Sequence, residues 1–209
     1  LPGLTTPLAC SSSGKLLAAA TQNNSVQVYD FATRNSRRLV FAMNDPCEQL
    51  LFSPDSQWLI AALHSGKMVA LQTSDWQPHK TWPNARQPVF HPEKPWIAFG
   101  GPERDVNLVD LSGKEFTSPR QFDDAELPVN FDHSGKRLLT QRGSHVTIWD
   151  AEQIRELRTI QDAGDINRLS PDGGMLISAD TSFGWLRFRT IAQRTDLSLP
   201  AHSSGITGL

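Results

Sequence analysis

The sequence is poor in the features that define several classes of protein. Only two of its 209 residues are cysteines, Cys10 and Cys47, too few for a disulfide framework, and we expect both to be small buried hydrophobic residues. No apolar run approaches the roughly 18 residues of a membrane-spanning helix, and no basic-then-apolar signal segment opens the chain. The unpaired cysteines, together with a nearly balanced charge, favour a cytoplasmic protein, and no membrane partner is expected.

An excess of charge of one sign is also missing. The 20 Lys and Arg residues nearly balance the 22 Asp and Glu residues, for a formal net charge of −2. Such a balance gives no excess of positive charge that would bind a polyanion, so no nucleic-acid partner is expected. The only basic cluster, Arg34, Arg37 and Arg38, is interpreted as an exposed turn and edge strand protected by charge. An acidic partner or a phosphate is the alternative interpretation.

Motifs for catalysis and for metal binding are absent as well. The Ser-Gly-Lys triplets at 13–15 and 134–136 lack the upstream glycine and the following Ser or Thr of a phosphate-binding loop. The six histidines are scattered and have no flanking cysteine pairs, so no zinc ligand set is apparent. The acidic run 123–126 lacks the alternating spacing of a calcium loop. We therefore expect no catalytic residue, no metal and no cofactor.

The pentapeptide VTIWD at 146–150 recurs in weakened form at near-constant intervals. Its last two residues, Trp149 and Asp150, correspond to Tyr29-Asp30, Leu71-Gln72, Val109-Asp110 and Phe188-Arg189. From Tyr29 onward the steps are 42, 38, 40 and 39 residues. A period of about 40 residues that contains four short strand-like runs is typical of a propeller blade. The chain is therefore predicted to be a repeat array.

A polar turn upstream of each copy repeats independently. The turns read SSSGK, SPDSQ, HPEKP, DHSGK and SPDGG, and their last residues lie 42, 38, 41 and 38 residues apart. Near-continuous apolar runs follow them at 16–21, 58–64, 95–101, 137–143 and 175–181, as expected for strands buried on both faces. A helix at 154–157 is rejected, because the corresponding residues of the other repeats are predicted to form a turn that leads into an outer strand.

On these motifs the chain resembles the WD-repeat β-propellers. The resemblance implies an all-β fold with about five four-stranded blades and the start of a sixth. The repeats run over 1–43, 44–83, 84–122, 123–161 and 162–200, with a partial repeat at 201–209. Because such propellers usually have seven blades, we expect a single, incomplete propeller domain from a longer protein.

The sequence departs from the pattern of well-formed WD repeats in one respect. The residues six positions before the Trp149 equivalents are Asn23, Ser65, Glu103, Gly143 and Ser182, and none is the expected Asp. Only His202 supplies the His of an incoming loop. We therefore expect the hydrogen-bond network of typical members to be largely absent and apolar packing to hold the repeats together. Trp58, Trp96, Trp149 and Trp185 are predicted to pack between blades, and Trp76 and Trp82 to lie on the rim.

The predicted function is a non-catalytic scaffold for protein–protein interaction, whose partner is another protein or a neighbouring domain of the same polypeptide. In this family the face with the second-to-third-strand turns and the entering loops is typically used. At matching positions that face would contain Asp45, Arg86, Arg104, Asp124 and Asp165. Two alternatives stay open: the sensory arm of a longer signalling enzyme, such as a kinase or nucleotidase, and the substrate-gating propeller of a hydrolase.

Overall fold

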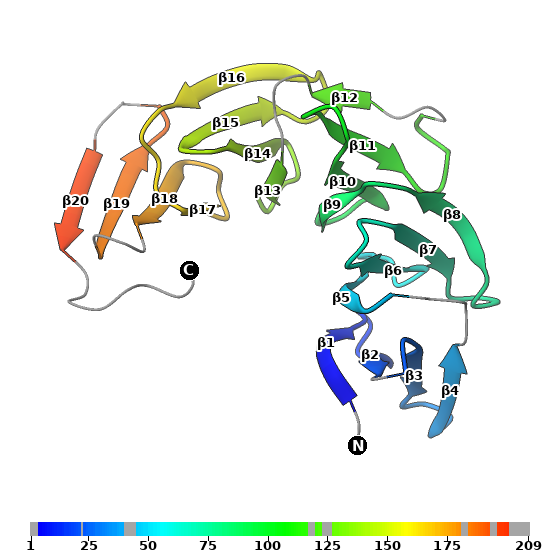
Figure 1. Cartoon of the computed structure of the whole chain (residues 1–209). Coiled ribbons are helices and arrows are strands. Elements are labelled where there is room, and N and C mark those ends of the chain that lie inside the picture. The colour runs from blue at the N-terminus through cyan, green and yellow to red at the C-terminus, as the bar shows by residue number, and fades with distance from the viewer. Residues whose placement is uncertain are drawn as a thin grey trace. The chain divides into compact units, whose positions relative to one another are not determined.

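The computed structural model describes residues 4–21, 23–39, 45–116, 120–122, 127–180, 184–192 and 196–200. Twenty strands form five four-stranded sheets, and no described residue is helical (Figure 1). Residues 151–154 form a turn that leads into a strand, so the rejection of a helix there is confirmed. The chain forms two compact units, residues 1–97 with 109–117, and residues 98–108 with 118–209.

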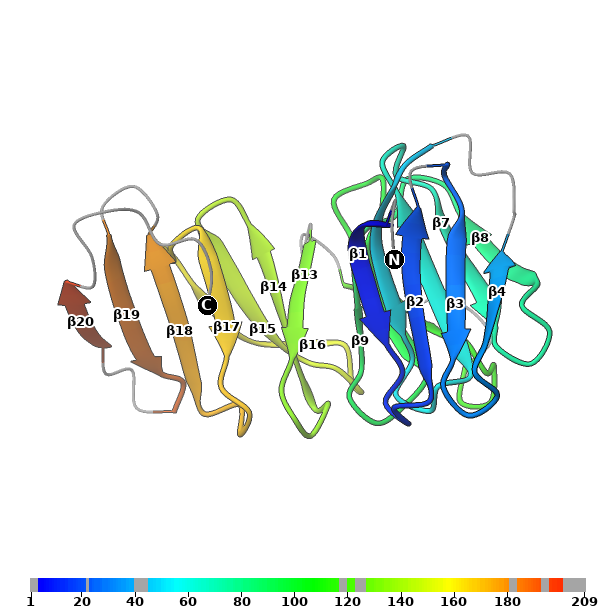
Figure 2. The same cartoon turned by 90° about the horizontal axis from the view of Figure 1, so that it is seen from below.

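The first unit holds two complete sheets, in each of which the strands follow one another in chain order. The first sheet consists of β1 (Leu4–Cys10), β2 (Leu16–Thr21), β3 (Val26–Asp30) and β4 (Asn35–Leu39), which lie side by side in Figure 2. The second consists of β5 (Cys47–Phe52), β6 (Trp58–Leu63), β7 (Met68–Gln72) and β8 (Pro78–Trp82). Neighbouring strands are antiparallel.

The second unit holds the fourth and fifth sheets, again antiparallel and in chain order. Their strands are β13 (Leu127–Phe131), β14 (Arg137–Arg142), β15 (His145–Asp150) and β16 (Arg155–Ile160), then β17 (Ile166–Leu169), β18 (Met175–Asp180), β19 (Trp185–Thr190) and β20 (Asp196–Pro200). The third sheet has residues in both units and contains β9 (Arg86–Phe90), β10 (Trp96–Gly100), β11 (Val106–Asp110) and β12 (Arg120–Phe122).

The recurring polar turns join the first and second strands of each sheet. Their first residues are all buried: Ser11, Ser53, His91, Asp132 and Ser170. In the second sheet Ser53 Oγ accepts the N–H of Trp58 at 2.9 Å, and in the fifth Ser170 Oγ accepts that of Met175 at 2.9 Å. A side-chain acceptor thus satisfies the first N–H of the next strand, which a buried backbone donor requires. The Ser-Pro-Asp motif therefore stabilises the turn between the first and second strands.

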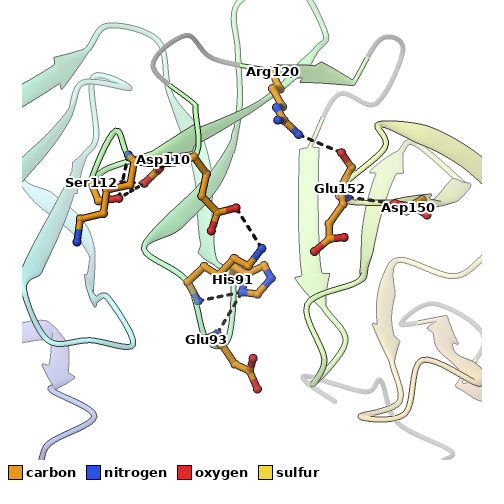
Figure 3. Close-up of polar contacts among 10 residues, drawn as sticks. His91, Glu93, Asp110, Ser112, Arg120, Asp150 and Glu152 are labelled. Atoms are coloured by element: carbon orange, nitrogen blue, oxygen red, sulfur yellow. Dashed lines mark hydrogen bonds and ion pairs between the residues drawn. The ribbon is translucent and has the colours of Figure 1, made fainter.

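In the third sheet His91 instead stabilises the turn itself with a ring nitrogen (Figure 3). Its Nδ1 accepts the N–H groups of Glu93 and Lys94, each at 3.1 Å. A nitrogen that accepts hydrogen bonds carries no proton, so the ring is neutral with its proton on Nε2. The ring packs edge-on against Trp96, with centroids 5.3 Å apart. His91 is therefore a buried structural residue.

The aspartates that close the Tyr-Asp, Val-Asp and Trp-Asp copies organise the turn between the third and fourth strands. Asp150 Oδ1 accepts the N–H groups of Glu152 at 3.1 Å and of Gln153 at 2.9 Å (Figure 3). Asp110 Oδ1 accepts that of Ser112 at 2.9 Å. Burial is the largest single influence on the Asp110 carboxyl and raises its pKa, but the hydrogen bonds from Ser112 and Glu115 together lower the pKa below its usual value. An acceptor two residues before the donor is typical of an Asx turn.

The structure corrects the fifth copy of this motif by one residue. Ile191 donates its N–H to Gly174 O at 2.9 Å, as Ala151 does to Lys136 O. Met175 is paired with Thr190, as Arg137 is with Asp150. The residues that correspond to Trp149-Asp150 are therefore Arg189-Thr190, and the assignment of Phe188-Arg189 was wrong.

Polar contacts join neighbouring sheets, so the expectation that apolar packing alone does so was too narrow. The outer strand of three sheets carries a basic side chain that reaches carbonyl groups in the next sheet. Lys80 Nζ donates to Asp110 O at 3.2 Å and Leu111 O at 3.3 Å, Arg120 Nη1 to Glu152 O at 3.0 Å, and Arg158 Nη1 to Thr190 O at 3.0 Å and Ile191 O at 2.8 Å. We call these contacts the cation straps.

Aromatic and apolar contacts complete the junctions. Trp149 packs edge-on against Phe122 of the preceding sheet, with centroids 5.4 Å apart, and its Nε1 donates to Thr140 Oγ1 at 2.8 Å. A tryptophan to threonine hydrogen bond thus holds the third strand of the fourth sheet to the second. The buried cluster between the fourth and fifth sheets includes Leu139, Val146, Ile148, Ile160, Leu169 and Leu176.

Removing a strap is expected to weaken one junction. Arg158→Met keeps the apolar stem but loses both hydrogen bonds, and we expect a loss of about 1–2 kcal/mol because charged donors contribute more than neutral ones. Arg155→Met is the matched control, because Arg155 is exposed three residues earlier in the same strand. Chemical denaturation should separate the two variants, and equal stability would show that the strap contributes nothing.

Candidate interaction surface

One end of each sheet carries two segments: the loop that enters the first strand and the turn between the second and third strands. We call it the entry end. The entering backbone is hydrogen-bonded to such a turn at several places. His64 N–H donates to Pro46 O at 2.9 Å, Ala85 N–H to Gly66 O at 2.7 Å, and Ala163 N–H to Ser144 O at 2.9 Å. These bonds fix the loop backbones without using their side chains.

In the first unit, Asp45 and Arg86 lie at the entry end as predicted from the sequence. Asp45 is half-buried, and its Oδ2 accepts the N–H of Ser65. Hydrogen bonds from Ser65 lower the pKa of the Asp45 carboxyl, so the group is anionic at neutral pH. Arg86 is the exposed first residue of β9. Asp45 therefore joins the entering loop to the turn between β6 and β7 as well as presenting charge.

The sequence interpretation missed an ion pair beside Asp45. His64 Nδ1 lies 2.5 Å from Glu48 Oε1, and both side chains are more than half exposed. The hydrogen bond and the charge of Glu48 raise the pKa of His64. The residues are 16 positions apart in sequence, and only the pairing of β5 with β6 brings them together. No motif in the sequence signals them.

In the second unit, Arg104 and Asp165 lie at the entry end. Arg104 is exposed in the turn between β10 and β11, with a left-handed φ of 60°. Next to it the buried Asp105 accepts hydrogen bonds from Asn107 at 2.8 Å and Gln121 at 3.1 Å, which hold the turn. Asp165 is exposed directly before β17. The fifth predicted residue, Asp124, lies outside the described residues, as does His202.

The cysteines differ in part from expectation, and the rim tryptophans are not prominent on the surface. Cys47 is half-buried, and burial raises its thiol pKa to about 11, but Cys10 is exposed, so the prediction that it is buried was wrong. Trp76 and Trp82 are half-buried, and Trp76 packs against the core between the first two sheets. Neither tryptophan is a fully exposed binding anchor.

Within the described ranges, no three His, Cys, Asp or Glu side chains are grouped as metal ligands. The same residues include no helix long and apolar enough to cross a membrane. Within each unit the entry end offers charged side chains of both signs, Asp45 with Arg86 and Arg104 with Asp165, on backbones fixed by hydrogen bonds. Such a surface suits charge-complementary, non-covalent recognition.

Comparisons with known proteins show the fold. No family model matches the chain, and no curated protein matches it. A chain of the crystal structure of the mitotic checkpoint complex is similar over 97% of this chain and 67% of its own length, with a TM-score of 0.70 and 15% identity. The Myceliophteria thermophila Cps50 (Swd1) beta-propeller domain is similar over 91% of this chain and 66% of its own, with a TM-score of 0.68 and 18% identity.

The five sheets are therefore blades of a β-propeller, the fold predicted from VTIWD and its copies. The chain spans about two thirds of the length of the matched structures. At these identities the similarity concerns the fold.

Proposed function

We propose that the chain is a protein-interaction module that binds a partner protein through the entry end of its blades. The observation that carries the proposal is the set of hydrogen bonds that fix the entering loops to the second-to-third-strand turns. Because these backbones are already ordered, little conformational entropy is lost when their side chains bind a partner. One of the similar structures is titled as a complex, which agrees with a role in assembly.

Charge at the entry end supplies the specificity. Arg86 and Arg104 are exposed cations, whereas Asp165 and the partly exposed Asp45 supply negative charge. Each unit thus has charges of both signs at its entry end, which fit a polar partner protein with complementary charges and reject partners that place like charges opposite. The chain's near-zero net charge agrees with local patterning of this kind.

Reversal of two charges tests the proposal. In the double variant Arg86→Glu and Arg104→Glu, affinity for a partner purified with the chain should fall at least about tenfold, because two favourable charge pairs become repulsive. Titration calorimetry measures the affinity, and circular dichroism checks that the fold is retained.

The matched control is Lys114→Glu with Arg155→Glu. Both residues are exposed beside turns between the third and fourth strands, and the change in net charge is the same. We expect the affinity of the control to stay within about twofold of the parent chain. If both double variants bind equally well, or if the control alone loses binding, the entry end is not the recognition surface.

A further inference from the structure

The fifth sheet exposes an apolar face. Met175, Leu197 and Leu199 are 38%, 56% and 44% exposed. Strand pairing places Leu197 opposite Phe188 and Leu199 opposite Leu186 on this face. The same register joins Ile177 to Phe188. Exposed apolar side chains contiguous over three strands mark an interaction surface.

These positions correspond to positions on the face of the fourth sheet that the fifth sheet covers. In the fourth sheet Leu139 is paired with Ile148, as Ile177 is with Phe188 in the fifth. Leu139 and Ile148 are buried against Leu169 of the next sheet. The exposed face of the fifth sheet therefore has the composition and register of a face that receives a following sheet.

The first sheet exposes a face of the complementary kind. Leu8 and Phe31 are 57% and 52% exposed, and Cys10 is exposed beside them. Cys10 is paired with Leu17, as Leu169 is with Leu176 in the fifth sheet, so the first sheet presents the positions that cover a preceding sheet.

The donor of the cation strap is missing from the exposed face of the fifth sheet. Arg158, opposite Ile148, donates to Thr190 O and Ile191 O of the next sheet. The residue that corresponds to Arg158 is Leu197, which lies opposite Phe188. The residue of the first sheet that corresponds to Ile191 is Phe31, since both donate to the end of the preceding turn. An exposed leucine thus stands where the donor would be, and the residue that carries the corresponding carbonyl is an exposed phenylalanine.

A second pair of positions agrees with this complementarity. Phe122, opposite Val106, packs on Trp149 of the next sheet with centroids 5.4 Å apart. Leu199, opposite Leu186, corresponds to Phe122, and Tyr29 corresponds to Trp149. Tyr29 already packs edge-on against Phe31, with centroids 5.0 Å apart. The two exposed faces would bring Leu199 onto Tyr29 and Leu197 onto Phe31.

We propose that the fifth sheet of one copy binds the first sheet of a second copy, head to tail, through an apolar seam in which Leu197 and Phe31 take the place of a cation strap. The interface is heterologous, because two different faces meet. Chains joined in this way either close into a ring or extend.

The test uses two variants, Leu197→Asp and Phe31→Asp, and multi-angle light scattering at tens of micromolar protein. The parent chain should associate, and each variant alone should be monomeric, because a buried unpaired carboxylate opposes the seam. An equimolar mixture of the two variants should give a dimer and no larger species, because each supplies the intact face that the other lacks. Circular dichroism confirms that both variants are folded.

The variant Leu197→Arg distinguishes a seam between a fifth and a first sheet from a seam between two fifth sheets. An arginine there can donate to the carbonyls of Asp30 and Phe31 as Arg158 does to its own acceptors, so the variant should still associate. Dimers of Phe31→Asp alone, together with loss of association in Leu197→Arg, would show that two fifth sheets face each other and would overturn the proposal. A monomeric parent chain would overturn it as well, because the faces would then be covered within one chain or by a different sheet.

Discussion

Replacing Gly164 by alanine is expected to destabilise the second unit strongly, because the added methyl group has no room. A Cβ at this position would lie 1.9 Å from the carbonyl oxygen of Ala179 and 2.4 Å from its carbonyl carbon. These atoms belong to β18, whose backbone is paired with β17 and β19, so neither can move without breaking strand hydrogen bonds. We expect a loss of about 3 kcal/mol or more, the upper range for overpacking.

The close approach also positions a side chain. Gly164 O accepts a hydrogen bond from Asn167 Nδ2 at 2.7 Å, and Asn167 is buried between the fourth and fifth sheets. Displacing residue 164 would remove this bond, which adds to the cost of the clash.

Gly174→Ala is the control for this prediction. Its Cβ would lie 3.2 Å from a carboxylate oxygen of Asp172, a side chain that can rotate away. Differential scanning calorimetry should show a fall in Tm of roughly 6–12 °C for Gly164→Ala and a much smaller change for Gly174→Ala. Equal Tm values for the two variants would mean that residue 164 does not approach β18 as described.

Gly173→Ala is expected to have the second largest effect, and Gly14 provides a comparison at the same position of its turn. Both glycines have a left-handed φ, of 66° and 67°, which costs an alanine about 1 kcal/mol. At Gly14 nothing lies within 4 Å of the added Cβ. At Gly173 it would meet Asp132 Oδ2 at 2.8 Å and Arg137 Nη1 at 2.9 Å.

The difference between the two variants isolates the contact between neighbouring turns. Arg137 Nη1 donates to Gly173 O, and His133 N–H donates to Pro171 O at 2.8 Å, so the turns of the fourth and fifth sheets are joined. We expect Gly14→Ala to cost about 1 kcal/mol and Gly173→Ala about 2–3 kcal/mol. Equilibrium denaturation measures both, and the same cost at the two sites would contradict the contact.

Much of the fold could be predicted because the repeat has two independent landmarks. The turn residue Ser53 and the pairs ending at Asp110 and Asp150 satisfy backbone donors locally, so their positions follow from short-range chemistry. The predicted strand at 58–64 corresponds to β6, and that at 175–181 to β18.

The register of the fifth repeat could not be predicted in this way. Phe188 matched Trp149 as an aromatic residue, yet Arg189 occupies that position in the sheet. In a strand a shift of one residue exchanges the two faces. The correction therefore moves Phe188 from the face that covers the preceding sheet to the exposed face that a following sheet would cover.

The cation straps also escaped prediction, because their acceptors are backbone carbonyls 30 or more residues away. Lys80 and Arg158 each follow their landmark pair by eight residues, and this recurrence is the only signal in the sequence. At the entry end, the positions of Asp45 and Arg86 followed from the resemblance. The pair of Glu48 and His64 did not, since it depends on the register of β5 and β6.

Hydrogen–deuterium exchange with and without the purified partner tests the central claim most directly. If the entry end is the recognition surface, the partner should slow exchange in the loops at 45–46, 64–67, 83–86, 102–104, 143–145 and 162–165. The turns at 53–57 and 170–174, at the opposite end of their sheets, should exchange as in the free chain. Protection confined to those turns, or to the outer strands β8 and β16, would contradict the account.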